Sequence, residues 1–181
     1  MRMRDVTTDA ELLIRVFDST FAAEGVCLLG GAAEPLYEPA QGEGPAHLWF
    51  TQDYASSALH EAAHWCLAGA RRRSCVDFDY RYVPAARRSE AEQAAFEHAE
   101  VRTQALEWRL SLAARVPFHL SVDSIGRDRA PFRARVVAEV RRRIAAGWPP
   151  RIDRLAVALA AATGGVACPA WDDFALELDD V

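Results

Sequence analysis

The sequence predicts a helix-dominated α+β fold with a small sheet, and three observations support that class. Several long segments place apolar residues at helical spacing, and only short apolar runs have the length of strands. The chain has 181 residues, of which 51% are hydrophobic. That length suits one core and is short for two ordinary domains. We therefore expect residues 1–181 to form a single domain, with a tail over about 164–181 that can lie at its periphery.

The first half of the chain predicts two helices and two strands. Apolar residues recur at helical spacing over residues 8–21. The runs at 26–29 and 47–51 are long enough only for strands, and the loop at 32–45 between them is rich in proline and glycine. Residues 53–70 predict a second helix that is apolar nearly all round, so we expect it to lie inside the domain.

The second half predicts one more strand and three more helices. Residues 76–83 alternate apolar or aromatic side chains with charged ones, which is the period of a half-buried strand. Ser89 followed by Glu92 fits a capping box, and no proline or glycine interrupts the helical pattern from there to Ala114. Further helices are expected over 129–146 and 153–162.

The composition excludes several classes of protein. The net charge is −5, so no large cationic surface for direct nucleic-acid binding is indicated. The first residues lack the apolar stretch of an export signal, and every apolar run is well short of the roughly 20 residues of a membrane span. The four cysteines show no Cys-x-x-Cys spacing, which favours free thiols. We therefore expect a soluble, cytoplasmic protein with no membrane partner.

The second predicted helix carries the sequence His60-Glu61-Ala62-Ala63-His64. Residues four apart in a helix stack one turn above the other, so both imidazoles lie on one side and can chelate one divalent ion. Glu61 is turned about 100° from His60 and can lie beside the open position of the ion, where it can take a proton from bound water. We therefore predict one metal ion at this helix, with Glu61 as the catalytic residue.

A purely structural role is the alternative for these side chains. His60 and His64 could be core histidines hydrogen-bonded to the backbone, with Glu61 paired to an arginine. Two imidazoles on one face of an apolar helix are, however, hard to bury without a shared partner. The metal is therefore the favoured interpretation.

The long helix after Ser89 offers the third ligand that two histidines still require. Glu97 and Glu100 are three residues apart and share a face, from which His98 points away. We favour Glu100 as the ligand and keep Glu97 as a neighbour or substitute. The alternative is that both are solvated surface carboxylates, but nearby apolar residues indicate that one edge of this helix is buried.

The ligand set alone leaves the chemistry open. Two histidines and one carboxylate serve non-haem iron(II) oxygenases and also hydrolytic zinc sites. A zinc metallopeptidase would use Glu61 to activate a zinc-bound water. A non-catalytic binding module would surround a structural metal with four protein ligands, and His98 or Cys66 is the candidate fourth.

Several motifs resemble those of the bacterial elongation factor P hydroxylase family. They follow in order over most of the chain, from about residue 10 to about residue 145. The matching segments are Glu34–Tyr37, Ala58–Gly69, Val76–Tyr80, Phe96–Glu97, Glu100–Val101, Gln104–Trp108 and Pro117–Phe118. Their order and spacing are more specific than the metal motif alone.

The resemblance implies a protein hydroxylase and a set of site residues. Members of that family hydroxylate a lysine of elongation factor P that already carries a β-lysyl group. Carried over to this sequence, their metal ligands correspond to His60, His64 and Glu100. The implied cofactor is one divalent metal, Fe(II), with O2 as co-substrate. We expect no 2-oxoglutarate requirement, because the chain has no His-x-Asp sequence and too few predicted strands for a jelly roll.

Three arginine clusters, at 71–73, 87–88 and 141–143, can steer an acidic protein partner such as elongation factor P towards the metal. The first cluster directly follows the metal helix and is the preferred candidate. The alternative is ordinary solvated charge near helix ends. Trp65 and Trp108 are predicted to be core aromatics rather than a substrate cage.

Overall fold

The computed structural model describes residues 9–79, 87–121 and 129–175. The helices and strands, in chain order, are α1 (Ala10–Thr20), η1 (Ala22–Glu24), β1 (Val26–Ala32), β2 (Leu36–Glu38), β3 (Ala46–Thr51), α2 (Ala55–Leu67), η2 (Arg72–Ser74), η3 (Val76–Asp79), α3 (Glu90–Ala114), α4 (Ala130–Ala146), α5 (Pro150–Thr163) and α6 (Trp171–Ala175). This part of the chain is helix-dominated with one small sheet, which confirms the predicted fold class.

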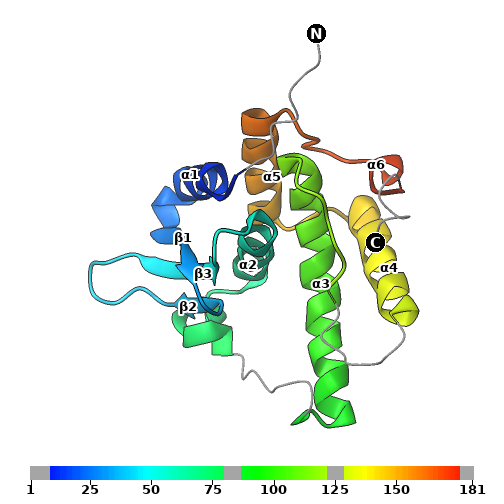
Figure 1. Cartoon of the computed structure of the whole chain (residues 1–181), viewed down its shortest axis with the longest axis horizontal. Helices are drawn as coiled ribbons and strands as arrows, with labels where there is room; N and C mark the ends of the chain where they lie inside the picture. Colours follow the sequence, from blue (N-terminus) through cyan, green and yellow to red (C-terminus); the bar gives the residue numbers. More distant parts are fainter. Residues whose placement is uncertain (1–8, 80–86, 122–128, 176–181) are drawn as a thin grey trace.

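The helices lie in successive layers beside the sheet (Figure 1). The second helix, α2, packs against β3 on one side and against α3 on the other, and α4 packs on α3 further from the sheet. Six side chains of α2 are buried, namely Ala58, Leu59, Ala62, Ala63, Trp65 and Cys66. The prediction that this helix lies inside the fold is therefore confirmed. Its position holds the two motif histidines against the long helix α3.

The long helix α3 begins where its capping signal predicts. The Ser89 side chain accepts a hydrogen bond from the Glu92 amide at 3.3 Å, and the Glu92 carboxylate accepts one from the Ser89 amide at 2.8 Å. This reciprocal pair satisfies two donors at the exposed helix end. The first helix, α1, is capped by Asp9, which accepts a hydrogen bond from the Leu12 amide at 2.8 Å.

The sheet has the strand order β1-β3-β2. Strands β1 and β3 are parallel, with Leu28 opposite Leu48, and β2 is antiparallel to β3, with Tyr37 opposite the same Leu48. Each outer strand also donates to a carboxylate from outside the sheet. The Leu28 amide donates to Asp18 at 2.8 Å, and the Tyr37 amide donates to Asp77 at 2.9 Å. These contacts occupy backbone N–H groups on the outer strands, which could otherwise pair with another strand.

The strand β2 was not predicted, whereas the strands predicted at 26–29 and 47–51 are confirmed as β1 and β3. It lies within the loop predicted at 32–45, where three residues carry too little alternation to indicate a strand. Pairing with β3 and burial of Tyr37 hold it in place. The Tyr37 side chain is 3% exposed, and its hydroxyl donates to the Arg73 carbonyl at 2.8 Å.

The strand predicted over 76–83 is wrong for residues 76–79, which form η3, and residues 80–83 lie outside the described residues. Asp77 and Phe78 have φ angles of 49° and 56°, in the left-handed region that no strand adopts. The Phe78 ring stacks on Tyr37 with a centroid distance of 4.3 Å, while Asp77 binds the Tyr37 amide. The alternating pattern therefore belongs to a tight turn folded against β2.

Two tryptophans lie at the centres of the two halves of the core. Trp65 packs beside Phe21 with a ring-centroid distance of 4.7 Å, and Trp108 packs beside Phe174 at 5.3 Å. Both tryptophans are at most 2% exposed, which confirms the prediction that they are core aromatics. Because Phe174 belongs to α6 and is fully buried, the described part of the tail is docked on α3.

Within the described parts of the chain, no helix has both the length and the apolar content that a membrane span requires.

Candidate metal centre

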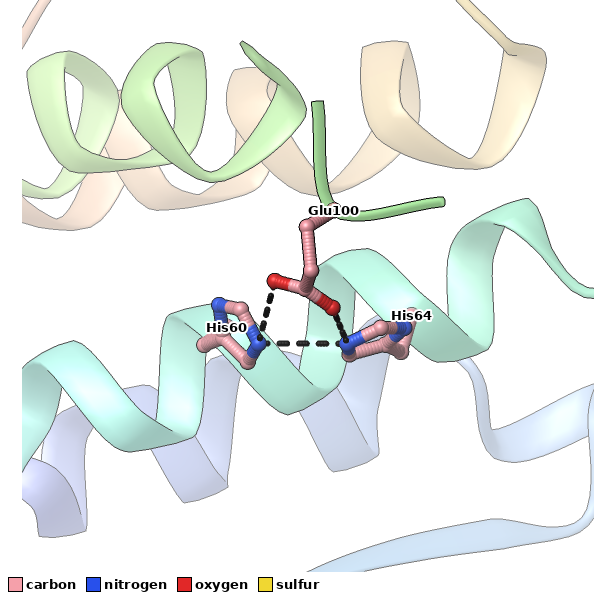
Figure 2. Close-up of side chains that lie close together, drawn as sticks. All are labelled: His60, His64 and Glu100. Carbon is pink, nitrogen blue, oxygen red and sulfur yellow. Dashed lines mark hydrogen bonds and ion pairs between the residues drawn. The ribbon is translucent and has the colours of Figure 1, made fainter. Parts of the chain in front are cut away.

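The two motif histidines lie one turn apart on the side of α2 that faces α3. Their Nε2 atoms are 3.1 Å apart, so both rings present the same nitrogen to one point (Figure 2). The ring planes are inclined at 77°, which lets the two nitrogens converge without stacking the rings. This is the chelating arrangement that the spacing of His60 and His64 predicts.

Glu100 reaches the same point from α3, as Figure 2 shows. One carboxylate oxygen lies 3.3 Å from Nε2 of His64, and the other lies 3.7 Å from Nε2 of His60. Ligands bonded to one ion at about 2.1 Å would be about 3.0 Å apart at right angles and about 3.4 Å apart in a tetrahedron. The observed separations lie close to these values, so the residues fit a divalent ion with little movement.

The structure distinguishes Glu100 from the other candidates on α3. The carboxylate of Glu97 accepts hydrogen bonds from Gln93 at 3.0 Å and from Arg135 at 3.0 Å, so it is engaged away from the histidines. His98 is exposed to solvent, as expected for a side chain that points away from this face. Of the two glutamates weighed from the sequence, only Glu100 lies beside both imidazoles.

The other nitrogen of each imidazole also has a partner on α3. Nδ1 of His60 lies 2.7 Å from Oε2 of Glu107, and Nδ1 of His64 lies 3.3 Å from Oγ1 of Thr103. When a metal takes both Nε2 atoms, each ring carries its proton on Nδ1, and these two side chains can accept it. The ring orientations are therefore fixed from outside the ligand set.

Gln104 holds the carboxylate of Glu100. Its amide nitrogen donates to Oε2 of Glu100 at 3.2 Å and to the Ser121 carbonyl at 2.7 Å, and its amide oxygen accepts from the Ser121 amide at 3.1 Å. The glutamine is 1% exposed, so its hydrogen bond to Glu100 is shielded from solvent and correspondingly strong. The third candidate ligand is thus tied to the segment that follows α3.

The roles of these three supporting residues were not predicted from the sequence. Thr103, Gln104 and Glu107 follow Glu100 by three, four and seven positions, which places all four on one face of α3. A buried polar stripe at this spacing, opposite two histidines, is the signal that identifies them. Their partners become clear only once α2 and α3 are packed together.

The centre is acidic, because three carboxylates surround two imidazoles. Burial lowers the pKa of His60, but the carboxylates of Glu107, Glu100 and Glu61 more than offset this and raise the pKa to about 10. Burial also raises the pKa of Glu100, whereas its hydrogen bond to His64 and the charges of both rings lower it to about 2. The metal-free centre therefore retains a proton on His60 at neutral pH, and a divalent cation can replace it.

Glu61 is half-buried beside the two histidines, and no described residue forms a hydrogen bond or ion pair with its carboxylate. The proposed pairing with an arginine is therefore absent from the described part of the chain. Burial raises the pKa of Glu61, and the charges of His64 and His60 partly oppose that shift. Its carboxylate is free to interact with a group that enters the centre.

The centre is open rather than closed. The side chains of His60 and His64 are 23% and 29% exposed, so solvent reaches part of each ring. Among residues 9–79, 87–121 and 129–175, the candidate metal group contains these histidines and Glu100, without Cys66 or His98 as a fourth protein ligand. A structural metal is normally closed by four ligands, so the geometry favours a site that leaves positions for substrates.

The family model described as elongation factor P hydroxylase matches residues 16–168. That range extends beyond residue 145, where the motif resemblance ends. The chain is also 40% identical over 156 residues to the elongation factor P lysine hydroxylase of Haemophilus influenzae, with 83% of this chain and 87% of that protein covered.

Proposed function

The chain belongs to the elongation factor P hydroxylase family, and from this premise we propose that it adds one oxygen atom to a lysine of translation elongation factor P. We further propose that this lysine already carries a β-lysyl group and that the reaction takes place in the cytoplasm. The observation that carries the proposal is the convergence of His60, His64 and Glu100 on one open point.

We propose His60, His64 and Glu100 as the ligands of one divalent metal, Fe(II), with O2 as co-substrate. When bound, Fe(II) supplies the activation of O2 that hydroxylation of an unactivated C–H bond requires. The two-histidine, one-carboxylate set is the ligand type of non-haem iron oxygenases and leaves positions open. The separations of the ligand atoms and the surplus of negative charge support this assignment.

The remaining polar residues would keep the ligands in place and manage protons. Glu107 would accept the Nδ1 proton of His60, and Thr103 would accept that of His64, so that each Nε2 directs its lone pair at the centre. Gln104 restrains one oxygen of Glu100. Glu61, which has no partner among the described residues, would hold or pass a proton at its carboxylate beside the reacting groups.

We also propose that the reaction does not use 2-oxoglutarate. Cupin-type enzymes that use this co-substrate take their ligands from the strands of a jelly roll. Here the candidate ligands come from two packed helices, and the described sheet has the three strands β1, β3 and β2. The architecture and the ligand spacing both differ from that class.

The proposal is tested by mass spectrometry of β-lysyl-modified elongation factor P after incubation with the protein, Fe(II), a reductant and O2. We expect a gain of one oxygen atom on the modified lysine, O2 consumption and no dependence on 2-oxoglutarate. His64→Ala should abolish the gain while the protein remains folded by circular dichroism. Cleavage of a peptide bond with zinc and without O2 uptake would overturn the proposal in favour of a metallopeptidase.

A further inference from the structure

A pocket lies at the junction of four helices, two of which carry the candidate metal ligands. Its volume is about 480 Å³. The lining is formed by Cys66 and Leu67 at the end of α2, Arg102 of α3, Arg143 of α4, and Pro149–Arg151 at the start of α5. We call this feature the arginine pocket, after Arg102, Arg143 and Arg151. Its size is within the range of sites for small ligands or a few side chains.

The arginine pocket is cationic in a chain whose net charge is −5. Three arginines line it, and no acidic residue is among its described lining residues. Arg102 is exposed and forms no hydrogen bond or ion pair with the described part of the chain. Arg151 donates only to backbone carbonyls, at 3.2 Å to Cys66 and 2.6 Å to Ala68. These two positive charges therefore have no counter-ion from the described residues.

The third arginine is only partly neutralised. Arg143 donates through Nε to Glu139 at 2.8 Å, but the same carboxylate also accepts two hydrogen bonds from Arg142, each at 2.7 Å. One carboxylate thus serves two guanidinium groups. The terminal nitrogens of Arg143 are not used by Glu139, which accepts only from its Nε.

The arginine pocket and the metal centre share the helices α2 and α3. Leu67 follows His64 by three residues, which is about 4.5 Å of helix rise. Arg102 directly precedes Thr103, whose hydroxyl contacts the His64 ring. Both helices therefore carry residues of the cationic pocket close in sequence to residues of the acidic centre.

We propose that the arginine pocket binds an anionic group of the substrate protein, a carboxylate or a phosphate, and so docks that protein beside the metal centre. This inference rests on the proposed function for the identity of the substrate. Guanidinium groups suit both anions, because their planar fork matches two oxygens at once. The acidic centre attracts the cationic lysine side chain, while the pocket takes an anionic group of the same protein.

The test compares Arg102→Gln and Arg143→Gln with the wild-type protein and with Arg15→Gln, whose side chain is 64% exposed on α1. Fluorescence anisotropy gives the Kd for labelled, modified elongation factor P, and hydroxylation kinetics give KM and kcat. We expect Kd and KM to rise about tenfold in each pocket variant, with kcat at saturation within about twofold of wild type. Arg15→Gln should match the wild type. Unfolding midpoints confirm that the variants are folded.

The Kd measurement separates this inference from the proposed function, because binding of elongation factor P does not depend on turnover. Binding that is weakened in both pocket variants supports the pocket even if no oxygen is transferred. A Kd within twofold of wild type in both variants, or no binding of elongation factor P to the wild type, overturns it. Phosphatase treatment of the substrate separates the two anions: loss of binding assigns a phosphate, and unchanged binding assigns a carboxylate.

Discussion

Nδ1 of His60 lies 2.7 Å from Oε2 of Glu107, while Nε2 of the same ring faces the carboxylate of Glu100. Both glutamates belong to α3 and are separated by seven residues, which is about two helical turns. A single helix therefore supplies a candidate ligand and the group that orients another ligand on α2. The rotation of α3 against α2 fixes the geometry of the whole centre.

Loss of the Glu107 carboxylate should weaken metal binding without removing a ligand. We expect Glu107→Ala to raise the Kd for Fe(II), or for Co(II) as an air-stable probe, by roughly 10- to 100-fold. Glu107→Gln keeps an acceptor for the His60 proton, so its metal affinity should fall less than that of Glu107→Ala. Isothermal titration calorimetry of the metal-free proteins measures both. Glu97→Ala is the matched control on the same helix, and equal Kd values for it and Glu107→Ala would contradict the orienting role.

The choice between the two candidate glutamate ligands can be tested directly. Glu100→Ala should weaken metal binding by more than the roughly 100-fold expected for an outer partner, because a bond to the metal is lost. Glu97→Ala should bind metal like the wild type, since Glu97 is engaged by Gln93 and Arg135. Metal content after dialysis, measured by mass spectrometry, reports the difference. A protein with Glu97→Ala that loses its metal would reverse the assignment.

The raised pKa of His60 makes the stability of the metal-free protein depend on pH. The folded protein binds this proton more tightly than the unfolded chain, whose histidine pKa is about 6.5. The folded pKa is about 10, so the stabilisation is complete below pH 6.5 and is lost as the pH rises towards 10. We expect the urea midpoint of chelator-treated protein to fall between about pH 6.5 and pH 9.5.

Two controls separate this effect from other titrations. His60→Gln carries no proton to lose, so its urea midpoint should fall less over the same range. Metal binding displaces the His60 proton, so the metal affinity of the wild type should rise with pH in that range. A midpoint that falls equally in the wild type and in His60→Gln would show that the decline comes from other groups.

The parts of the site that were predicted depend on local signals. His60 and His64 share a helix face because of their spacing alone, and the Ser89 capping box fixes where α3 begins. Glu100 could be favoured over His98 because helical rotation separates the two. None of these inferences requires knowledge of how the helices pack.

The parts that were missed depend on contacts between distant segments. The roles of Thr103 and Glu107 exist only because α3 faces two imidazoles on α2. The strand β2 forms because β3 and Asp77 bind it, although its own three residues carry no strand pattern. The alternation at 76–79 came from a turn whose left-handed residues pack on Tyr37, so a period-two pattern alone was misleading.

The close approach of the segment after α5 to the end of α3 requires a glycine at position 165. A Cβ on Gly165 would lie 2.2 Å from the Ala113 carbonyl oxygen and 2.6 Å from that of Leu112, both in the α3 backbone. The Val166 amide donates to the Leu112 carbonyl at 3.1 Å, so the segment cannot move outward without breaking this bond. Gly165→Ala should therefore destabilise the protein by about 2–3 kcal/mol, a typical cost of overpacking.

Urea unfolding measures this loss, and Gly69→Ala serves as the control. A Cβ on Gly69 would meet nothing within 4 Å, so that variant should stay within about 0.5 kcal/mol of wild type. The metal Kd of folded Gly165→Ala should be unchanged, because Ala113 lies thirteen residues, or more than three turns, along α3 from Glu100. Equal unfolding midpoints for the two alanine variants would show that the segment after α5 does not press on α3 as the structure places it.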